Sequence, residues 1–156
     1  MADICINRLT VTGPAEERRR LVQLWADGKP VFNRILPVPR RFKDDNEWRC
    51  LNWGTKSDVG EEEWDCASVE EQEEVVTIWF ATAWTPPLPV IEAMSVLYSG
   101  LEFDLAYFES GERFAGEAHF VEGEGQTDLY EGDDPAYQDI AFEFGWEEDD
   151  EGDDEE

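Results

Sequence analysis

The chain contains few groupings of residues that could carry out catalysis, and its one histidine is His119. His119 stands between Ala118 and Phe120 in an alternating run, with no Ser or Cys near it to suggest a proton relay. A general base needs partners positioned around it. We therefore expect His119 to be structural or simply exposed, and we expect the chain not to be an enzyme.

The three cysteines, Cys5, Cys50 and Cys66, are odd in number and widely spaced, and they include no CxxC pair. This pattern favours neither a disulfide framework nor a zinc site. We expect reduced, packed thiols.

Acidic residues are so numerous that a glycosidase-like carboxylate pair can be found anywhere, which makes such a pair uninformative. Asp128, Glu131, Asp133 and Asp134 could gather around a hard cation, but their order does not follow the spacing of an EF-hand loop. We expect neither a metal nor a cofactor.

The segment Asn52–Lys56 combines an amide, a hydroxyl, a cation and a permissive glycine. A structural turn pinned by its tryptophan is the favoured interpretation, and a specific contact site is the alternative. The residues that would make contacts in the second case are Asn52, Trp53, Thr55 and Lys56.

The formal charge of -27 is distributed unevenly along the 156 residues. Residues 1–56 hold eleven of the twelve basic residues against seven acids, whereas residues 57–156 hold only Arg113 against 32 acids. The negative electrostatic field of this acidic segment repels nucleic acids and anionic membranes and attracts basic surfaces. We expect a basic protein partner, with no direct binding to nucleic acid or membrane.

Carboxylates on one face of a strand lie ~6.6 Å apart at i and i+2, and phosphates along one DNA strand rise ~3.4 Å each. Alternate acids could therefore replace every second phosphate in a Lys/Arg channel. The residues expected to do so are Glu61, Glu62, Glu63, Glu102, Asp104, Asp128, Glu131, Asp133, Asp134, Asp139 and Glu143.

The elements that position these residues follow from periodicity and breakers. Residues 4–12 alternate as a strand, and a helix follows Gly13-Pro14 and ends near Gly28. Prolines make 29–60 an ordered but irregular connection.

The apolar run within 74–84 predicts a central strand covered on both faces, and a helix with a stop at Gly100 follows it. Residues 101–107 and 114–120 alternate as a hairpin. The only candidate for a strand before residue 74 is 64–68.

Residues 123–135 are rich in Gly and Asp and indicate a loop, and Ile140, Phe142, Phe144 and Trp146 indicate a last strand. The order of elements fits an α+β, ferredoxin-like sheet with two helices on one face and extra C-terminal strands. We expect one domain over 1–146 and an acidic, disordered tail over 147–156.

Five short motifs of the chain form a recognisable set: Asn7–Gly13, Phe32–Pro37, Asn52–Lys56, Thr82–Pro89 and Phe114–Gly116. With these motifs the sequence resembles the YubB ferredoxin-like domain family, which is found on conjugative plasmids and in phages. The resemblance covers roughly residues 1–121. It implies the same fold, with no assigned reaction, and an accessory or anti-defence role on a mobile element.

These features lead to a functional hypothesis: a DNA-mimicking inhibitor from a phage or plasmid that blocks a host defence protein, such as a CRISPR effector or a restriction complex. The alternative is a protein-binding adaptor or assembly module whose acidity serves solubility. No apolar run approaches the ~20 residues of a membrane span, and no signal peptide is apparent, so we expect the cytoplasm of a bacterial host cell.

Overall fold

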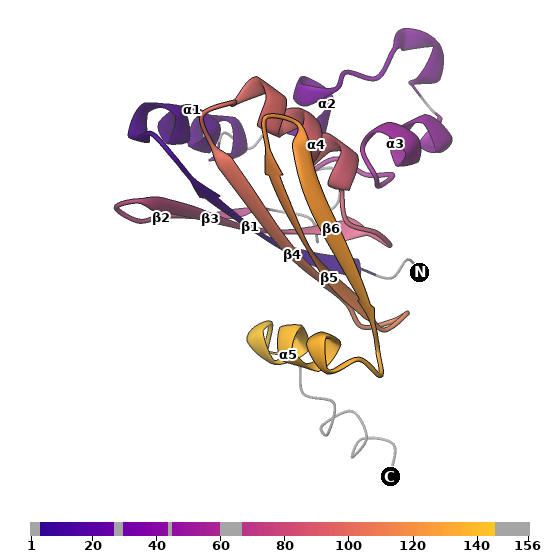
Figure 1. The fold of residues 1–156 in the computed structure, drawn as a ribbon. Helices are drawn as coiled ribbons and strands as arrows, with labels where there is room; N and C mark the ends of the chain where they lie inside the picture. The colour runs from indigo at the N-terminus through magenta and orange to yellow at the C-terminus, as the bar shows by residue number, and fades with distance from the viewer. Residues whose placement is uncertain (1–3, 27–29, 44, 60–66, 146–156) are drawn as a thin grey trace.

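An antiparallel sheet of six strands organises the chain, in the order β2-β3-β1-β4-β5-β6 (Figure 1). The computed structural model describes residues 4–26, 30–43, 45–59 and 67–145. The strands are β1 Ile4–Thr12, β2 Ser68–Glu71, β3 Val75–Ala83, β4 Glu102–Glu109, β5 Phe114–Val121 and β6 Glu124–Glu131. The helices are α1 Ala15–Ala26, α2 Phe32–Ile35, α3 Asn46–Asn52, α4 Leu88–Leu97 and α5 Pro135–Glu143, with a 3-10 turn at Arg40–Phe42.

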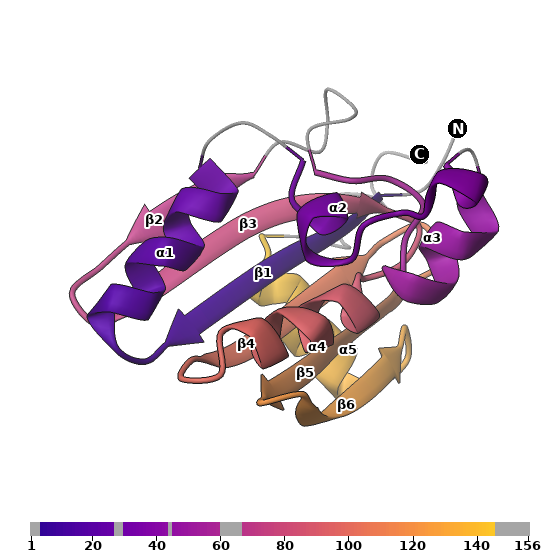
Figure 2. The ribbon, with the colours of Figure 1, turned by 90° about the horizontal axis from the view of Figure 1, so that it is seen from above.

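The alternation of side chains along β1 separates the two faces of the sheet. Cys5, Leu9 and Val11 are fully buried and join the main core. The intervening residues point to the opposite face, because successive side chains of a strand alternate. Figure 2 shows α1, α2 and α4 lying over the first of these faces.

Large aromatic side chains fill the space between the sheet and the helices. The ring of Trp25 lies 4.8 Å from that of Phe80, and the ring of Phe32 lies 5.8 Å from that of Trp53, measured between centroids. All four side chains are at most 3% exposed. Buried rings of this size contribute much of the apolar area that stabilises a small domain.

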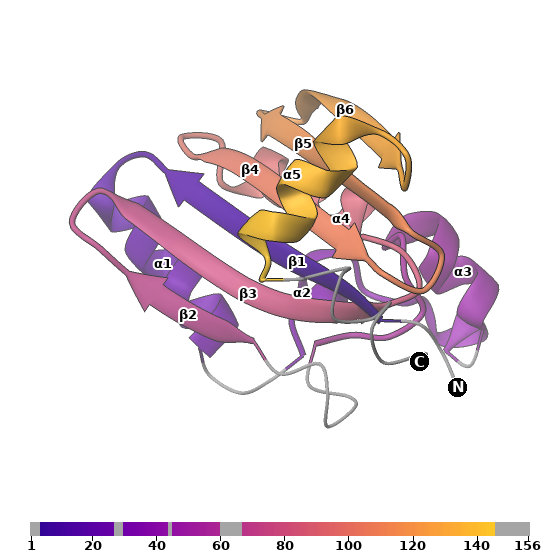
Figure 3. The ribbon, with the colours of Figure 1, turned by 90° about the horizontal axis from the view of Figure 1, so that it is seen from below.

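The helix α5 lies on the opposite face of the sheet (Figure 3). A second, smaller core joins Tyr137, Ile140 and Ala141 of this helix to Phe108 of β4 and Ala115 of β5. α5 thus covers the part of that face around Phe108 and Ala115 and leaves the rest of it open.

The order β1-α1-β2-β3-α4-β4 and the sheet order β2-β3-β1-β4 form the expected ferredoxin-like arrangement, which β5 and β6 extend on one side. The predicted fold class, with extra C-terminal strands, is confirmed. The predicted first strand, first and second helices and 101–120 hairpin are also present, as β1, α1, α4 and β4-β5.

No helix among the described residues is long and apolar enough to cross a membrane.

The connection expected to be irregular over 29–60 instead contains α2, the 3-10 turn and α3. Asp45 begins α3 by accepting hydrogen bonds from the backbone N–H groups of Glu47 and Trp48. Pro30 precedes α2, and Pro37 and Pro39 separate α2 from the 3-10 turn, so these helices are too short to show a helical period in the sequence.

Two expectations about the strands near residue 70 need correction. β3 is next to the edge of the sheet, and Thr77 and Trp79 on one of its faces are only half-buried, so it is not a doubly covered central strand. β2 begins at Ser68, the last residue of the segment 64–68 that was its candidate, and 64–66 lie outside the described residues.

The loop expected over 123–135 is wrong for most of its length, because Glu124–Glu131 forms β6. Every side chain of this strand is exposed except that of Tyr130, which is half-buried. An edge strand wetted on both faces needs no apolar alternation, and the usual sequence signal is therefore missing.

The last strand expected over 140–146 is also wrong, because α5 occupies Pro135–Glu143. Its buried residues Tyr137, Ile140 and Ala141 have helical spacing, and Asp134 caps its first turn through a hydrogen bond from the N–H of Ala136. Phe142 is exposed, so it belongs to the apolar alternation of the sequence without being part of a buried face.

A buried carboxylate, that of Asp58, anchors the start of α2. Its Oδ1 accepts the N–H groups of Val31, Phe32 and Val59, and its Oδ2 accepts that of Asn33, all between 2.7 and 2.9 Å. The side chain is buried, and burial raises the pKa of this carboxyl while the four donors oppose that shift.

Replacing this carboxylate tests its structural role. Asp58→Ala leaves four buried donors without this acceptor and should lower the free energy of unfolding by about 3 kcal/mol. Asp58→Asn keeps one oxygen and should lower it by about 1–2 kcal/mol. Asp45→Asn is the control, because Asn is an equally good N-cap, and it should change stability by less than ~0.5 kcal/mol. Urea denaturation at pH 7 measures all three, and an Asp58→Ala protein as stable as wild type would contradict this role.

Candidate functional site

The face of the sheet opposite α1 and α4 carries a strip of polar side chains beside α5, which we call the open face. A shallow depression of about 310 Å³ lies within it. The open face consists of Thr10, Glu102, Asp104, Glu117, His119, Gln126 and Asp128, and the basic Arg8 also lines the depression.

Strand register brings these residues together from distant parts of the chain. Thr10 is opposite Asp104, Asp104 is opposite His119, and His119 is opposite Gln126, so four strands contribute to one row. In the next row Arg8 is opposite Ala106, which is followed by Glu117 and Asp128. Directly opposed side chains in a sheet lie ~4.5–5.5 Å apart at their Cβ atoms, so each row is one continuous surface.

Glu117 and Asp128 face each other directly across β5 and β6. Both are exposed, and like charges opposed in this way destabilise an antiparallel pair. The pKa of nearby Tyr130 is raised by desolvation and by the charges of Asp128 and Glu117. A concentrated negative potential therefore exists at this end of the open face.

His119 lies within this acidic surface. Its Nδ1 is 2.6 Å from Oδ1 of Asp104, its Nε2 is 3.9 Å from Oε1 of Glu102, and its side chain is 47% exposed. The hydroxyl-bearing Thr10 lies two strands away, ~10 Å, which exceeds hydrogen-bond reach. The pair thus lacks the geometry of a Ser-His-Asp relay with that residue.

Three of the predicted partner-binding residues, Glu102, Asp104 and Asp128, share the open face. Asp128 reaches it from a strand instead of the expected loop. Glu131 and Asp133 line a different hollow, on the helix side of β6. Glu61, Glu62 and Glu63 lie outside the described residues.

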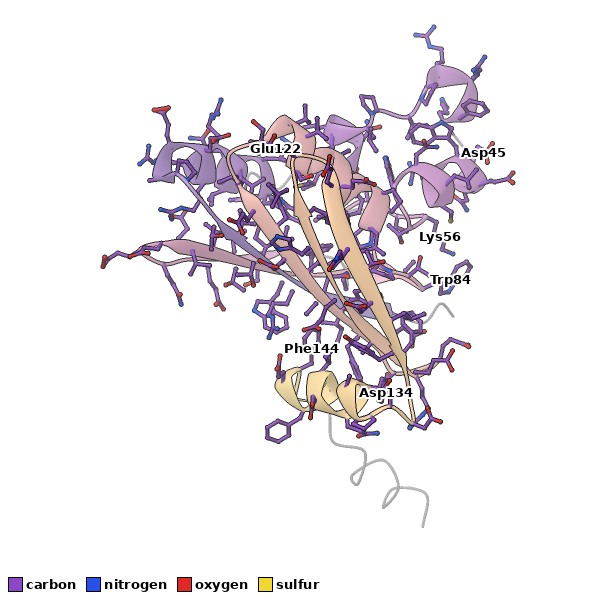
Figure 4. All side chains as sticks on the ribbon, viewed as in Figure 1. Asp45, Lys56, Trp84, Glu122, Asp134 and Phe144 are labelled. Carbon is purple, nitrogen blue, oxygen red and sulfur yellow. The ribbon has the colours of Figure 1, made fainter. Side chains whose placement is uncertain are left out.

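The remaining predicted acids belong to α5 and its cap, and the strand positions expected for Asp139 and Glu143 are wrong. Asp134 is engaged as the N-cap (Figure 4). Glu143 forms an ion pair of 3.1 Å with Arg8, whose guanidinium also lies 5.4 Å from the ring centroid of Phe144. These contacts hold α5 to the sheet, and Asp139 is exposed on the helix surface.

Sequence reasoning did not single out Thr10, Glu117 or Gln126. Glu117 and His119 occupy the polar phase of β5, so the alternation of that strand contained the signal for Glu117. Thr10 and Gln126 could be placed only with the register, which depends on the whole sheet. Among the described residues, no group of three or more His, Cys, Asp or Glu side chains could hold a metal ion.

The Asn52–Lys56 segment is mostly internal. Trp53 is fully buried and donates from Nε1 to the carbonyl of Leu36, and buried Thr55 donates to the carbonyl of Ala83. The amide of Asn52 donates to the carbonyl of Trp48. These contacts support the structural interpretation for three of the four predicted residues.

Lys56 is the exception in this segment. Its Nζ lies 4.0 Å from the ring centroid of Trp84, a side chain that is 47% exposed, and the two residues lie close together in Figure 4. This cation–π pair is the part of the second predicted site that faces the surface.

Comparison with known proteins agrees with this architecture. The family described as "Ferredoxin-like domain in Api92-like protein" matches residues 63–138. The fold is a ferredoxin-like domain. The crystal structure of a protein api92 from Yersinia pseudotuberculosis superposes with a TM-score of 0.63, covering 84% of this chain and 98% of that one. Its sequence is 8% identical, so the likeness is one of fold. No curated protein matches this chain.

The structural role of Trp53 can be tested against its neighbour Lys56. Trp53→Ala opens a large cavity in the aromatic core and should lower the free energy of unfolding by about 3–5 kcal/mol. Lys56→Ala removes one surface cation–π contact and should lower it by no more than about 1 kcal/mol. Chemical denaturation followed by tryptophan fluorescence measures both. Equal effects of the two substitutions would show that Trp53 does not support the core.

Proposed function

We propose that this protein is an acidic nucleic-acid mimic that binds the basic surface of a nucleic-acid-binding protein and blocks it stoichiometrically. The observation that supports this most strongly is the direct opposition of Glu117 and Asp128 on an open face that also carries Glu102 and Asp104. Opposed like charges weaken the sheet in the free protein. A basic partner that pairs with these carboxylates would relieve the repulsion, and this relief would add to the affinity of the complex.

The spacing of these carboxylates suits a phosphate-binding channel. Glu102 and Asp104 are two residues apart on β4 and so lie ~6.6 Å apart, close to the ~6.8 Å rise of two phosphates. Glu117 and Asp128 continue the array across neighbouring strands. Lys and Arg side chains that bind phosphates would find acceptors at similar intervals.

Solubility alone is the competing explanation for the acidity, since charged surfaces commonly serve that purpose. Residues 67–145, which the structure describes throughout, contain eighteen Asp and Glu against one basic residue, Arg113. A net charge of magnitude ~2–8 suffices for a small domain. The excess, together with the placement of four of these acids on the open face and the opposition of Glu117 to Asp128, favours recognition.

The resemblance to the YubB family supplies the biological setting of the proposal. A protein carried by a phage or plasmid meets host defence complexes in the bacterial cytoplasm, and many such complexes act through basic nucleic-acid channels. A defence protein of this kind is the proposed target, and no catalytic step is required.

An adaptor role is the second candidate, and the contact of half-buried Lys56 with exposed Trp84 is the feature that favours it. Exposed tryptophan side chains are enriched among the residues that dominate specific protein contacts. Lys56 and Trp84 would then bind the partner, and substitution of the open face would leave binding intact.

Affinity capture from a nuclease-treated bacterial lysate tests the proposal. At low salt, the mimic should retain a DNA- or RNA-binding complex, and raising the salt should release it because ion pairs are screened. Retained proteins are identified by mass. A partner that resists salt, or one that binds no nucleic acid, would instead support the adaptor.

Neutralising the open face should weaken binding to the captured target. The triple variant Glu102→Gln, Glu117→Gln and Asp128→Asn spares the Asp104–His119 contact and should reduce affinity by about ten- to a hundredfold near 0.1 M salt. Titration of the purified complex by fluorescence anisotropy measures the change.

The control carries the same change in charge elsewhere. Glu73, Glu74 and Glu92 are exposed outside the open face, and their triple replacement by Gln should alter affinity by less than about threefold. If both triple variants bind with equal affinity, net charge and not the open face determines binding, and the proposed site is wrong.

A further inference from the structure

The outer edge of β6 is a second surface that this fold presents. β6 ends the sheet at one side, so no described strand pairs with it beyond β5. It is eight residues long, whereas β2 at the opposite edge has four. A long edge strand presents a row of backbone N–H and C=O groups that another extended chain can pair with.

The turn that joins β5 to β6 determines which groups face outward. Glu122 and Gly123, at φ 53° and 84°, form a two-residue loop of the kind in which both residues have positive φ, closed by Val121 opposite Glu124. In such a hairpin the closing pair exchanges hydrogen bonds and every second pair after it does so too. The backbone groups of Thr127 and Leu129 therefore point away from β5.

A groove lies beside this edge on the helix side of the sheet. It has a volume of about 1040 Å³ and separates β6 from the start of α4. Leu129, 62% exposed, lines it together with the apolar side chains of Pro86, Leu88, Pro89 and Phe114. Tyr107 and the charged residues Glu112, Arg113, Glu131 and Asp133 complete much of the lining. Side chains of an added strand that point to this side would meet Leu129 and the apolar part of the groove.

The other side of the same edge is acidic. Asp128 lies there, with Glu117 directly opposite on β5 and Glu124 at the beginning of the strand. An added strand would place its alternate side chains on this side, because successive residues of a strand point to opposite faces. Basic residues in those positions would meet the carboxylates.

We infer that β6 binds an extended segment of the target that alternates apolar and basic residues, adding it to the sheet as a seventh, antiparallel strand. The inference rests on the proposed function, because it takes the partner to be basic. Main-chain hydrogen bonds to Thr127 and Leu129 provide affinity, and the two unlike sides of the edge provide specificity.

Charge excludes a second copy of the chain as the occupant. Pairing β6 with another β6 would bring Glu124, Asp128 and Glu131 of each copy close to the same three acids of the other. Acids on an edge strand also protect against such pairing, but protection alone does not account for the apolar residues of the groove alongside. The combination selects a basic chain with apolar residues at every second position.

The test uses wild-type protein and a labelled synthetic peptide, Lys-Val-Lys-Val-Lys-Val-Lys, which has the charge and alternation of the inferred segment. In antiparallel pairing, the valines that face the groove are opposite Thr127 and Leu129 and direct their N–H groups toward β6. N-methylation of the valines should weaken binding at least about tenfold, whereas N-methylation of the lysines should change it less than about threefold.

A protein variant gives an independent readout. Thr127→Pro removes an outward N–H without removing a bond to β5, and should weaken peptide binding about tenfold. Thr127→Val keeps the N–H and should bind the peptide as wild type does. Near-UV circular dichroism verifies that both variants are folded.

Anisotropy titrations in low salt provide these affinities. Equal binding of the two methylated peptides, the reverse preference, or self-association of the chain through β6 in sedimentation would overturn the inference. If the peptide fails while the lysate still yields a salt-released nucleic-acid-binding partner, only the edge-strand inference falls. If the peptide binds as expected but no such partner exists, only the proposed function falls.

Discussion

Strand register is the constraint on which the rest of this structure depends. β1 pairs with both β3 and β4, and its Leu9 and Val11 are locked into the core beneath α1 and α4. A slip of one residue would turn these side chains to the opposite face, which the apolar core forbids. The same register extends through β4 and β5 to β6, and it places Glu102, Asp104, Glu117 and Asp128 on the open face.

Packing on both faces balances the repulsion that this gathering creates. The aromatic core around Trp25 and Phe80 lies on one face, and α5 covers part of the other. Arg8 links them, since its guanidinium lies near the rings of Trp79 and Phe144 and pairs with Glu143. Glu117 and Asp128 lie beyond α5, where a binding partner would have access to them.

Strong periodicity made part of the fold predictable from sequence, including β1, α1, α4 and the β4-β5 hairpin. β6 was missed because its two wet faces impose no alternation, and α5 was missed because Phe142 imitates a strand period while pointing to solvent. Within the site, Glu102, Asp104 and Asp128 were expected. The opposition of Glu117 to Asp128 required the register of β6, which depends on contacts that no local pattern contains.

A nucleic-acid mimic and nucleic acid should exclude each other from the binding channel of the target. This exclusion is tested most directly by titrating the protein into its purified target already loaded with a labelled duplex, at several salt concentrations. We expect the duplex to be released completely as the protein is added in excess, with an apparent affinity that falls as salt rises. A stable ternary complex, in which the target holds the duplex and this protein together, would contradict it.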